Sequence, residues 1–148
     1  MADSGGMSLW MAEICITMYK ENLQIMNEIT KKVFINFSNH PSSTWSEPQI
    51  AAALQYADRI IDFPFPSVDP NMDESGLYEL AGEIKEKILS MNPAAVMCQG
   101  EFGLSFAVIR RLLDAGVTVL HACSERNVTA NGNVKTVRFD FVQFRRFG

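Results

Sequence analysis

Apolar and polar residues along the chain fall into blocks that alternate between two kinds of pattern. Short runs rich in β-branched and aromatic residues predict strands, and longer stretches with apolar residues three and four positions apart predict helices. The predicted strands are 33–37, 59–65, 94–99 and 117–124, and the predicted helices are 46–57, 73–91 and 103–116. Strands separated by amphipathic helices indicate parallel pairing through crossovers. We therefore expect an α/β fold, a Rossmann-like three-layer sandwich with a mainly parallel sheet and helices on both faces.

The pattern changes in the last quarter of the chain. The dipeptide Asn131-Gly132 lies between two β-prone runs, and this dipeptide favours a two-residue type I′ turn. We therefore expect a C-terminal antiparallel β-hairpin. In a regular strand, Phe141 and Phe144 would point to opposite faces, because they are three residues apart. We therefore expect either a β-bulge near Phe141 or burial of both faces there.

The first 25 residues differ from the rest because they mix glycine and serine with an apolar segment. Trp10, Ile14 and Met18 recur at roughly helical spacing within that segment. Terminal segments are often poorly ordered unless they are tied down. We expect residues 1–25 to be an extension, either a short docked helix or disordered, ahead of a single domain over residues 26–148.

Composition and charge narrow the choice of ligand. The chain has 148 residues, 47% of them hydrophobic, and a net charge of −4, which argues against binding duplex DNA. Residues 110–148 hold seven bases and three acids, so residues 1–109 hold 13 − 7 = 6 bases and 17 − 3 = 14 acids. The C-terminal part is therefore near +4 and the remainder near −8. A small anionic ligand fits this asymmetry better than a long polyanion does.

The cysteines and the N-terminus indicate a cellular compartment. The odd set Cys15, Cys98 and Cys123 forms no C-x-x-C pair, which suits a reducing environment. No apolar run approaches the roughly 20 residues that span a bilayer, and Asp3 stands where a signal peptide carries a base. We expect a cytoplasmic protein without membrane contact. Cys98, Cys123 and His121 are expected to pack within strands, and we expect neither a metal site nor a cofactor.

A ligand site is predicted at the carboxyl ends of the parallel strands, where ligands of open α/β sheets bind. This rule nominates the turns at 38–41, 66–70, 99–103 and 124–126, of which the second is the least informative. The dinucleotide and P-loop fingerprints are absent, as is the G-x-S-x-G elbow of hydrolases. The candidate binding residues in these turns are Ser38, Asn39, His40, Gln99, Gly100, Glu101, Phe102, Gly103, Ser124 and Arg126.

Several of these residues admit two interpretations. Gly100 and Gly103 either let the backbone approach a ligand or serve only the sterics of a tight turn. Glu101 either caps the following helix or accepts a hydrogen bond from a ribose hydroxyl. His40 is either a surface histidine or a phosphate contact and proton shuttle. Arg126 is a candidate for bidentate contact with a phosphate.

Taken together, four segments resemble a known family. They are "FSNH", "CQGEFGLSFAVIRRLLDAGV", "HACSERNV" and "KTVRFDFVQFRRF". The set resembles the small stand-alone CARF-like proteins, which carry the CRISPR-associated Rossmann fold and act as ring nucleases of type III CRISPR systems. The resemblance covers roughly residues 32–147. Two positions depart from the pattern, because Asn39 separates Ser38 from His40 and Glu125 stands where a base is common.

The resemblance implies a homodimer with a groove that holds a cyclic oligoadenylate second messenger. It also implies metal-independent cleavage, in which a ribose 2′-OH attacks the adjacent phosphate and the protein orients the attack. By position, the resemblance implies catalytic roles for Ser38, His40 and Arg126, and binding roles for Asn39, Gln99, Gly100, Glu101, Phe102, Gly103 and Ser124. The alternatives are a sensor or sponge that binds nucleotides without cleaving them, and a dimeric scaffold.

Overall fold

The computed structural model of the chain describes residues 8–148. The chain divides after Lys31 into two compact units. The first contains helix α1 (Leu9–Thr30), which has 22 residues and passes without a break through the boundary expected at Met26. The second unit begins at Lys32 and contains the sheet. No helix in the described part of the chain has the length and apolar character needed to cross a membrane.

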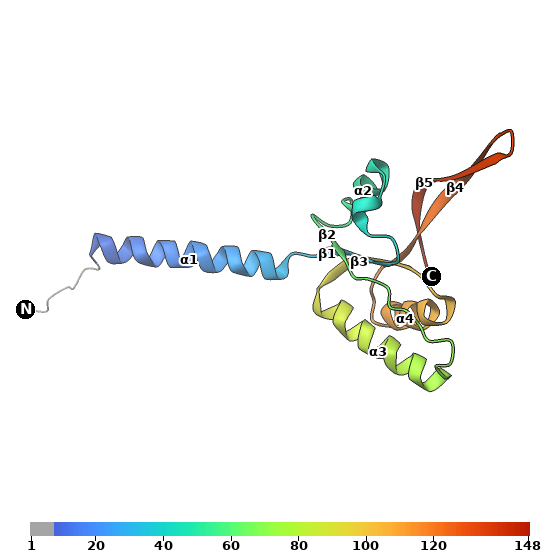
Figure 1. Cartoon of the computed structure of the whole chain (residues 1–148). Helices are drawn as coiled ribbons and strands as arrows, with labels where there is room; N and C mark the ends of the chain where they lie inside the picture. The colour runs from blue at the N-terminus through green and yellow to red at the C-terminus, as the bar shows by residue number, and fades with distance from the viewer. Residues whose placement is uncertain (1–7) are drawn as a thin grey trace, which may run out of the picture. The chain divides into compact units, whose positions relative to one another are not determined.

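The second unit is built around one mixed sheet, as predicted (Figure 1). Its elements are β1 (Val33–Ser38), α2 (Glu47–Ala53), β2 (Ile60–Asp62), α3 (Glu74–Ser90), β3 (Pro93–Gln99), α4 (Phe102–Asp114), β4 (Val119–Asn131) and β5 (Val134–Arg146). Within residues 8–148 the sheet has five strands in the order β2-β1-β3-β4-β5. The first four are parallel to their neighbours, and β5 is antiparallel to β4. The predicted α/β fold is confirmed.

Helices cover both faces of the sheet, with α3 and α4 on one face and α2 on the other (Figure 1). The first face buries Val33, Ile35, Phe37, Ile84, Ile88, Val96, Leu104, Val108 and Leu112. The second face buries Phe34, Ala53, Ala95, Met97 and Leu120. Every residue of β1 is therefore buried, as expected for a central strand of a parallel sheet.

The order of the strands reverses beside β1. The chain leaves β1 for β2 on one side, and it then crosses back through α3 to β3 on the other side. The carboxyl ends of β1 and β3 consequently lie next to each other, with Ser38 opposite Gln99. Such a reversal is where open α/β sheets form a crevice for ligands.

Two elements near this edge are shorter than predicted. Helix α2 ends at Ala53, because the chain turns at Leu54 and places Tyr56 against Phe34, with ring centroids 5.9 Å apart. The regular part of β2 ends before Pro64, which has no N–H to donate to a ladder. The Phe65 N–H still donates to Ser38 O at 3.3 Å, and this bond keeps the segment beside β1.

Strand β4 is longer than predicted and forms a projecting hairpin with β5 (Figure 1). Strand β3 pairs with β4 only at Val119 and Leu120, whereas β5 pairs with β4 as far as Asn131. The turn expected at 124–126 is therefore wrong, because the ladder with β5 continues the strand through it. The turn type also differs, since Gly132 with φ 59° is followed by Asn133 at negative φ, the pattern of type II′ rather than type I′.

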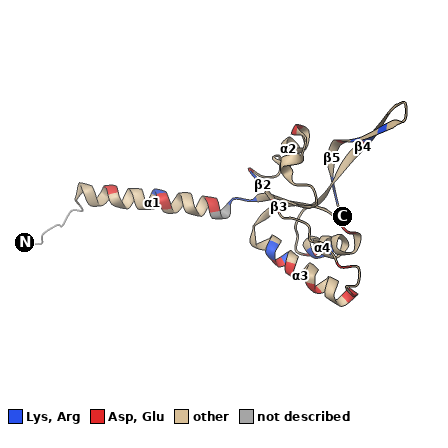
Figure 2. Cartoon of the chain, viewed as in Figure 1, with Lys and Arg blue, Asp and Glu red and all other residues tan. Residues whose placement is uncertain are grey.

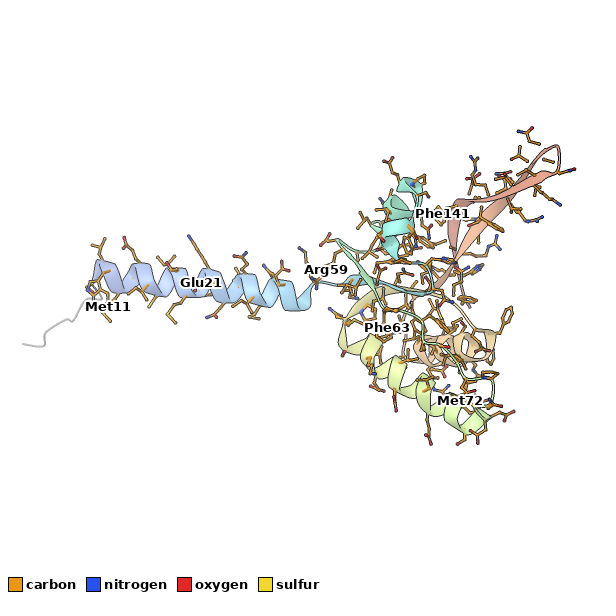
Figure 3. The ribbon with its side chains drawn as sticks, in the orientation of Figure 1. Met11, Glu21, Arg59, Phe63, Met72 and Phe141 are labelled. Carbon is orange, nitrogen blue, oxygen red and sulfur yellow. The ribbon has the colours of Figure 1, made fainter. Side chains whose placement is uncertain are left out.

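A β-bulge lies at Val142, next to the position predicted. Gln143 pairs with Cys123 and Phe141 pairs with Ser124, so Val142 is the extra residue. The bulge brings Phe141 and Phe144 onto one face, where their ring centroids are 4.9 Å apart. Phe141, labelled in Figure 3, thereby joins the aromatic cluster on the α2 face.

Helix α3 carries signals at both of its ends. The Asp73 carboxylate accepts a hydrogen bond from Gly76 N at 2.8 Å, which caps the amino end. Glu74 lies in the first turn and Lys87 in the last, and Figure 2 shows the basic residues of α3 toward its end. This distribution complements the helix dipole.

Replacement of Phe34 by alanine should test the core on the α2 face. Phe34 is fully buried and contacts Trp45, Tyr56 and Phe144, so Phe34→Ala should lower the free energy of unfolding by about 3–5 kcal/mol. Phe139→Ala, at a ring 66% exposed, should change it by less than about 0.5 kcal/mol. Urea denaturation of the full chain measures both, and equal effects would contradict the assigned core.

Candidate functional site

The end of β1 is held by a network of polar groups. Ser38 is 5% exposed, and its Oγ donates to Asn36 Oδ1 at 2.7 Å and accepts from His40 N at 3.2 Å. Asn36 Nδ2 donates to His40 O and to Asp62 Oδ1, both at 2.8 Å. The hydroxyl of Ser38 is thus engaged in holding its own turn, because buried polar groups need partners.

A cleft of about 280 Å³, with polar side chains set in a mainly apolar lining, lies between the ends of β1 and β2. It is lined by Asn36, Ser38, Asn39, Pro41, Asp62, Pro64 and Phe65. The Asp62 carboxylate in its wall accepts from Ser42 N and Ser42 Oγ, each at 3.0 Å. The backbone carbonyl of His40 lies in this region and also accepts a hydrogen bond from Trp45 Nε1 at 3.2 Å. The side chain of His40 is exposed. The structure therefore places Ser38 and Asn39 in the cleft and the His40 imidazole outside its lining.

Gln99 ends β3 and bridges to β4. Its Oε1 accepts a hydrogen bond from Ala122 N at 3.0 Å, which extends the pairing of the two strands by a side-chain contact. Its amide NH₂ has no partner within residues 8–148. A donor therefore remains at the carboxyl edge of the sheet, and it can serve the acceptor atoms of a base or a ribose.

Packing explains the glycine at position 100. A Cβ on Gly100 would overlap the ring of Phe65, which stacks on Phe37 at a centroid distance of 4.5 Å. Phe63, labelled in Figure 3, packs against the same Phe37 ring. A Cβ on Gly103 would lie 3.1 Å from Leu77 Cδ2, which is the end of a flexible side chain. The steric interpretation therefore accounts for Gly100, and the approach of a ligand to this turn stays a prediction.

Glu101 caps helix α4. Its Oε1 accepts from Gly103 N at 3.0 Å and its Oε2 from Leu104 N at 2.7 Å. These two bonds, that from Leu104 first, hold the pKa of the Glu101 carboxyl below its ordinary value. The helix terminus that could bind an anion is already occupied by this carboxylate. A phosphate is therefore excluded from the amides of Gly103 and Leu104 while Glu101 is ionised.

Ser124 and Arg126 lie apart from these residues. Both belong to the hairpin, where they pair with Phe141 and Phe139. Arg126 is four residues past Ala122, which corresponds to about 13 Å along an extended strand. The expectation that Arg126 joins Ser38 and Gln99 at one edge of a single chain is wrong, because β4 carries it outward along the hairpin.

An apolar cavity of about 330 Å³ lies on the α4 side of Gln99. It is lined by Cys98, Gln99, Gly100, Phe102, Ser105, Phe106, Ile109, His121 and Phe147. Burial raises the pKa of the Cys98 thiol to about 12, so Cys98 stays protonated and unreactive at neutral pH. His121, which was expected only to pack within its strand, forms part of the wall.

The sequence reasoning missed most of this cavity, although one signal was available. Phe102, Ser105, Phe106 and Ile109 follow the spacing i, i+3, i+4, i+7 and form a second face of a helix whose core face is already accounted for. Arg145 was also missed. It pairs with His121, and paired residues of an antiparallel ladder project from the same face, so its guanidinium belongs to the cavity's side of the sheet.

Comparison with protein families agrees with this division of the chain. A model of the Uncharacterized protein MJ1673 family matches residues 32–145. The chain belongs to the MJ1673 family. The matched residues begin at the start of the sheet unit and end within β5, so they include the whole lining of the 280 Å³ cleft and all of the 330 Å³ cavity's lining except Phe147. The description of the family states no activity, and no curated protein matches the chain.

Replacement of Gly100 by alanine tests the steric role. The added Cβ must displace the Phe65 ring, so Gly100→Ala should lower the free energy of unfolding by about 1–3 kcal/mol. In a Phe65→Ala background, Gly100→Ala should lower the free energy of unfolding by less, because the obstructing ring is gone. Urea denaturation of the unmodified chain, the two single variants and the double variant gives the coupling free energy between the two positions. A Gly100→Ala protein of unchanged stability would show that packing does not require the glycine.

The capping role of Glu101 predicts a dependence on pH. Its folded-state pKa lies below the ordinary 4.5, so the stability that it contributes is present above pH 4.5 and is lost as the pH falls through the lowered value. Glu101→Gln should lower the melting temperature at pH 7, and its difference from the unmodified chain should shrink at lower pH. Glu83→Gln, at an exposed carboxylate of α3, is the control. A difference for Glu101→Gln that is independent of pH would contradict the cap.

Proposed function

We propose that the MJ1673 family domain binds a nucleotide at the carboxyl edge of its sheet. The observation that carries this proposal is the reversal of strand order at β1 and β3, where Ser38 lies opposite Gln99 and a cavity opens on each side. Crevices at such reversals bind nucleotides in open α/β sheets. The 330 Å³ cavity has apolar walls suited to a base, and the 280 Å³ cleft carries Asn39 and Asp62, whose polar groups suit the hydroxyls of a ribose.

The nucleotide that we propose is a cyclic oligoadenylate bound by a homodimer. The resemblance to the CARF-like ring nucleases supports this choice. The excess of bases in residues 110–148, seven against three acids, supports an anionic ligand. Arg145 offers a guanidinium on the same face as the apolar cavity, and guanidinium groups match phosphate oxygens bidentately.

Binding without turnover is the function that the geometry supports best. The three residues expected to be catalytic are not assembled within one chain, because the Ser38 hydroxyl is engaged by Asn36 and Arg126 lies out on the hairpin. Ring cleavage is the second candidate. It is favoured by the exposed imidazole of His40 beside the 280 Å³ cleft, and it would require a second copy of the chain to supply Arg126.

Thermal unfolding with cyclic tetra-adenylate tests the proposed binding. A ligand at 100 times its Kd adds about 2.7 kcal/mol of stability, which raises the melting temperature of a chain of this size by several degrees. Linear tetra-adenylate is the control for the phosphate charge. Arg145→Ala should reduce the shift, and Lys135→Ala, which removes an exposed cation near the hairpin turn, should not. No shift with cyclic tri-, tetra- or hexa-adenylate would contradict the proposal.

Chromatography of the same mixtures separates binding from cleavage. A protein that only binds returns the cyclic compound unchanged after incubation without added metal. Linear adenylates ending in a cyclic phosphate would instead establish ring cleavage. In that case His40→Ala should abolish the product while leaving the thermal shift in place.

A further inference from the structure

Helix α4 presents apolar residues on two faces, and only one of them packs in the core. Leu104, Val108 and Leu112 are fully buried against the sheet and α3. On the other face Phe102 is 92% exposed and Phe106 is 63% exposed. Apolar side chains that gather on an exposed surface often mark a place where a ligand or a partner binds. The exposed rings of α4 lie on the wall of the 330 Å³ cavity.

The wall that faces α4 is also built from rings. His121 and Phe147 contact each other with ring centroids 5.0 Å apart and planes inclined by 45°. Both line the cavity, whose floor includes Cys98 and Gly100 at the end of β3. A space between ring-bearing walls suits a flat aromatic group, because such groups stack on aromatic side chains.

One buried hydroxyl in the cavity has only a weak partner. Ser105 is 9% exposed and lines the cavity, and its side chain interacts with the thiol of Cys98. A thiol is a weak hydrogen-bonding group, and the Ser105 hydroxyl can either donate or accept. An aliphatic occupant would add no better partner for Ser105, whereas a heteroaromatic ring with nitrogen atoms at its edge would supply one.

We propose that this cavity is a nucleobase pocket that takes a purine such as adenine. The ring lies between Phe106 on α4 and the His121 face, and its edge nitrogens meet the Ser105 hydroxyl and the free amide NH₂ of Gln99. The phosphate lies outside, on the side of Arg145, because the Glu101 carboxylate occupies the α4 terminus. This assignment rests on the proposed nucleotide function and names the part of the ligand that enters the cavity.

Fluorescence titration with 2-aminopurine riboside tests the pocket, because the emission of this purine is quenched when it stacks. The full chain should quench the probe, and unlabelled adenosine should compete while ribose 5-phosphate should not. Phe106→Ala should weaken binding by about fivefold to a hundredfold, the range for loss of one stacking ring. Phe139→Ala is the matched control, because Phe139 is 66% exposed but lies on the hairpin.

Ser105→Ala supplies a variant for which misfolding is not an alternative explanation. Its affinity for the probe should fall about threefold to tenfold, as expected for one lost hydrogen bond. Its melting temperature without ligand should stay within a few degrees of that of the unmodified chain, because only a weak bond to the Cys98 thiol has been removed. Equal affinity of Ser105→Ala, Phe106→Ala and the unmodified chain would overturn the assignment.

The same variants separate this inference from the proposed function. If cyclic tetra-adenylate stabilises the chain and Phe106→Ala binds it normally, the nucleotide function stands and the pocket is wrong. If the cyclic compound has no effect but the probe binds in a manner that depends on Phe106, the pocket stands and the cyclic ligand is wrong. Absence of binding by every purine probe overturns both.

Discussion

The burial of β1 on both faces is the constraint on which the rest of the domain depends. All six residues of β1 are buried, β2 and β3 flank it, and the strand order reverses there. The two polar residues at its end, Asn36 and Ser38, are buried with it and must find partners inside the protein. Their bonds to His40 and Asp62 shape the turn that follows.

The same requirement explains why the carboxyl edge is less reactive than its residue types indicate. Hydroxyl, amide and carboxylate groups gather there, yet most of their hydrogen-bonding atoms are used within the chain. The Glu101 carboxylate occupies the amino end of α4, and the carbonyl oxygen of the Gln99 side chain binds the backbone of β4. The groups that stay accessible there include the Gln99 NH₂, the exposed side chains of Asn39 and His40, and the rings that line the 330 Å³ cavity. These groups suit recognition of a ligand better than they suit chemistry on it.

The hairpin separates two residues that lie close together in the sequence. His121 and Arg126 are five residues apart, but His121 lies where β4 is part of the sheet and Arg126 lies where β4 pairs with β5 alone. His121 therefore faces the cavity, while Arg126 is carried outward with Phe139, which is 66% exposed. Arg126 could reach the carboxyl edge of the sheet only in a second copy of the chain. The proposed ring cleavage therefore depends on the oligomeric state.

Local patterns were sufficient for the alternation of strands and helices, the hairpin and the bulge near Phe141, because side-chain periodicity and turn propensity act over a few residues. They also nominated the turns after β1 and β3, through the rule for parallel sheets, and the structure brings the ends of these two strands side by side. They failed for the turn at 124–126, because a strand that is polar on one face continues wherever another strand pairs with it. That pairing is a long-range contact between Ser124 and Phe141.

The sequence by itself determined the fold class. Only the tertiary structure decided how the residues at the carboxyl edge of the sheet are packed. Gly100 is a glycine because Phe65, distant in the chain, occupies the space beside it, and Ser105 is buried beside the thiol of Cys98, which comes from the neighbouring strand. The physical reason is that burial and hydrogen-bond satisfaction depend on neighbours that are remote in sequence, whereas periodicity depends on neighbours that are close.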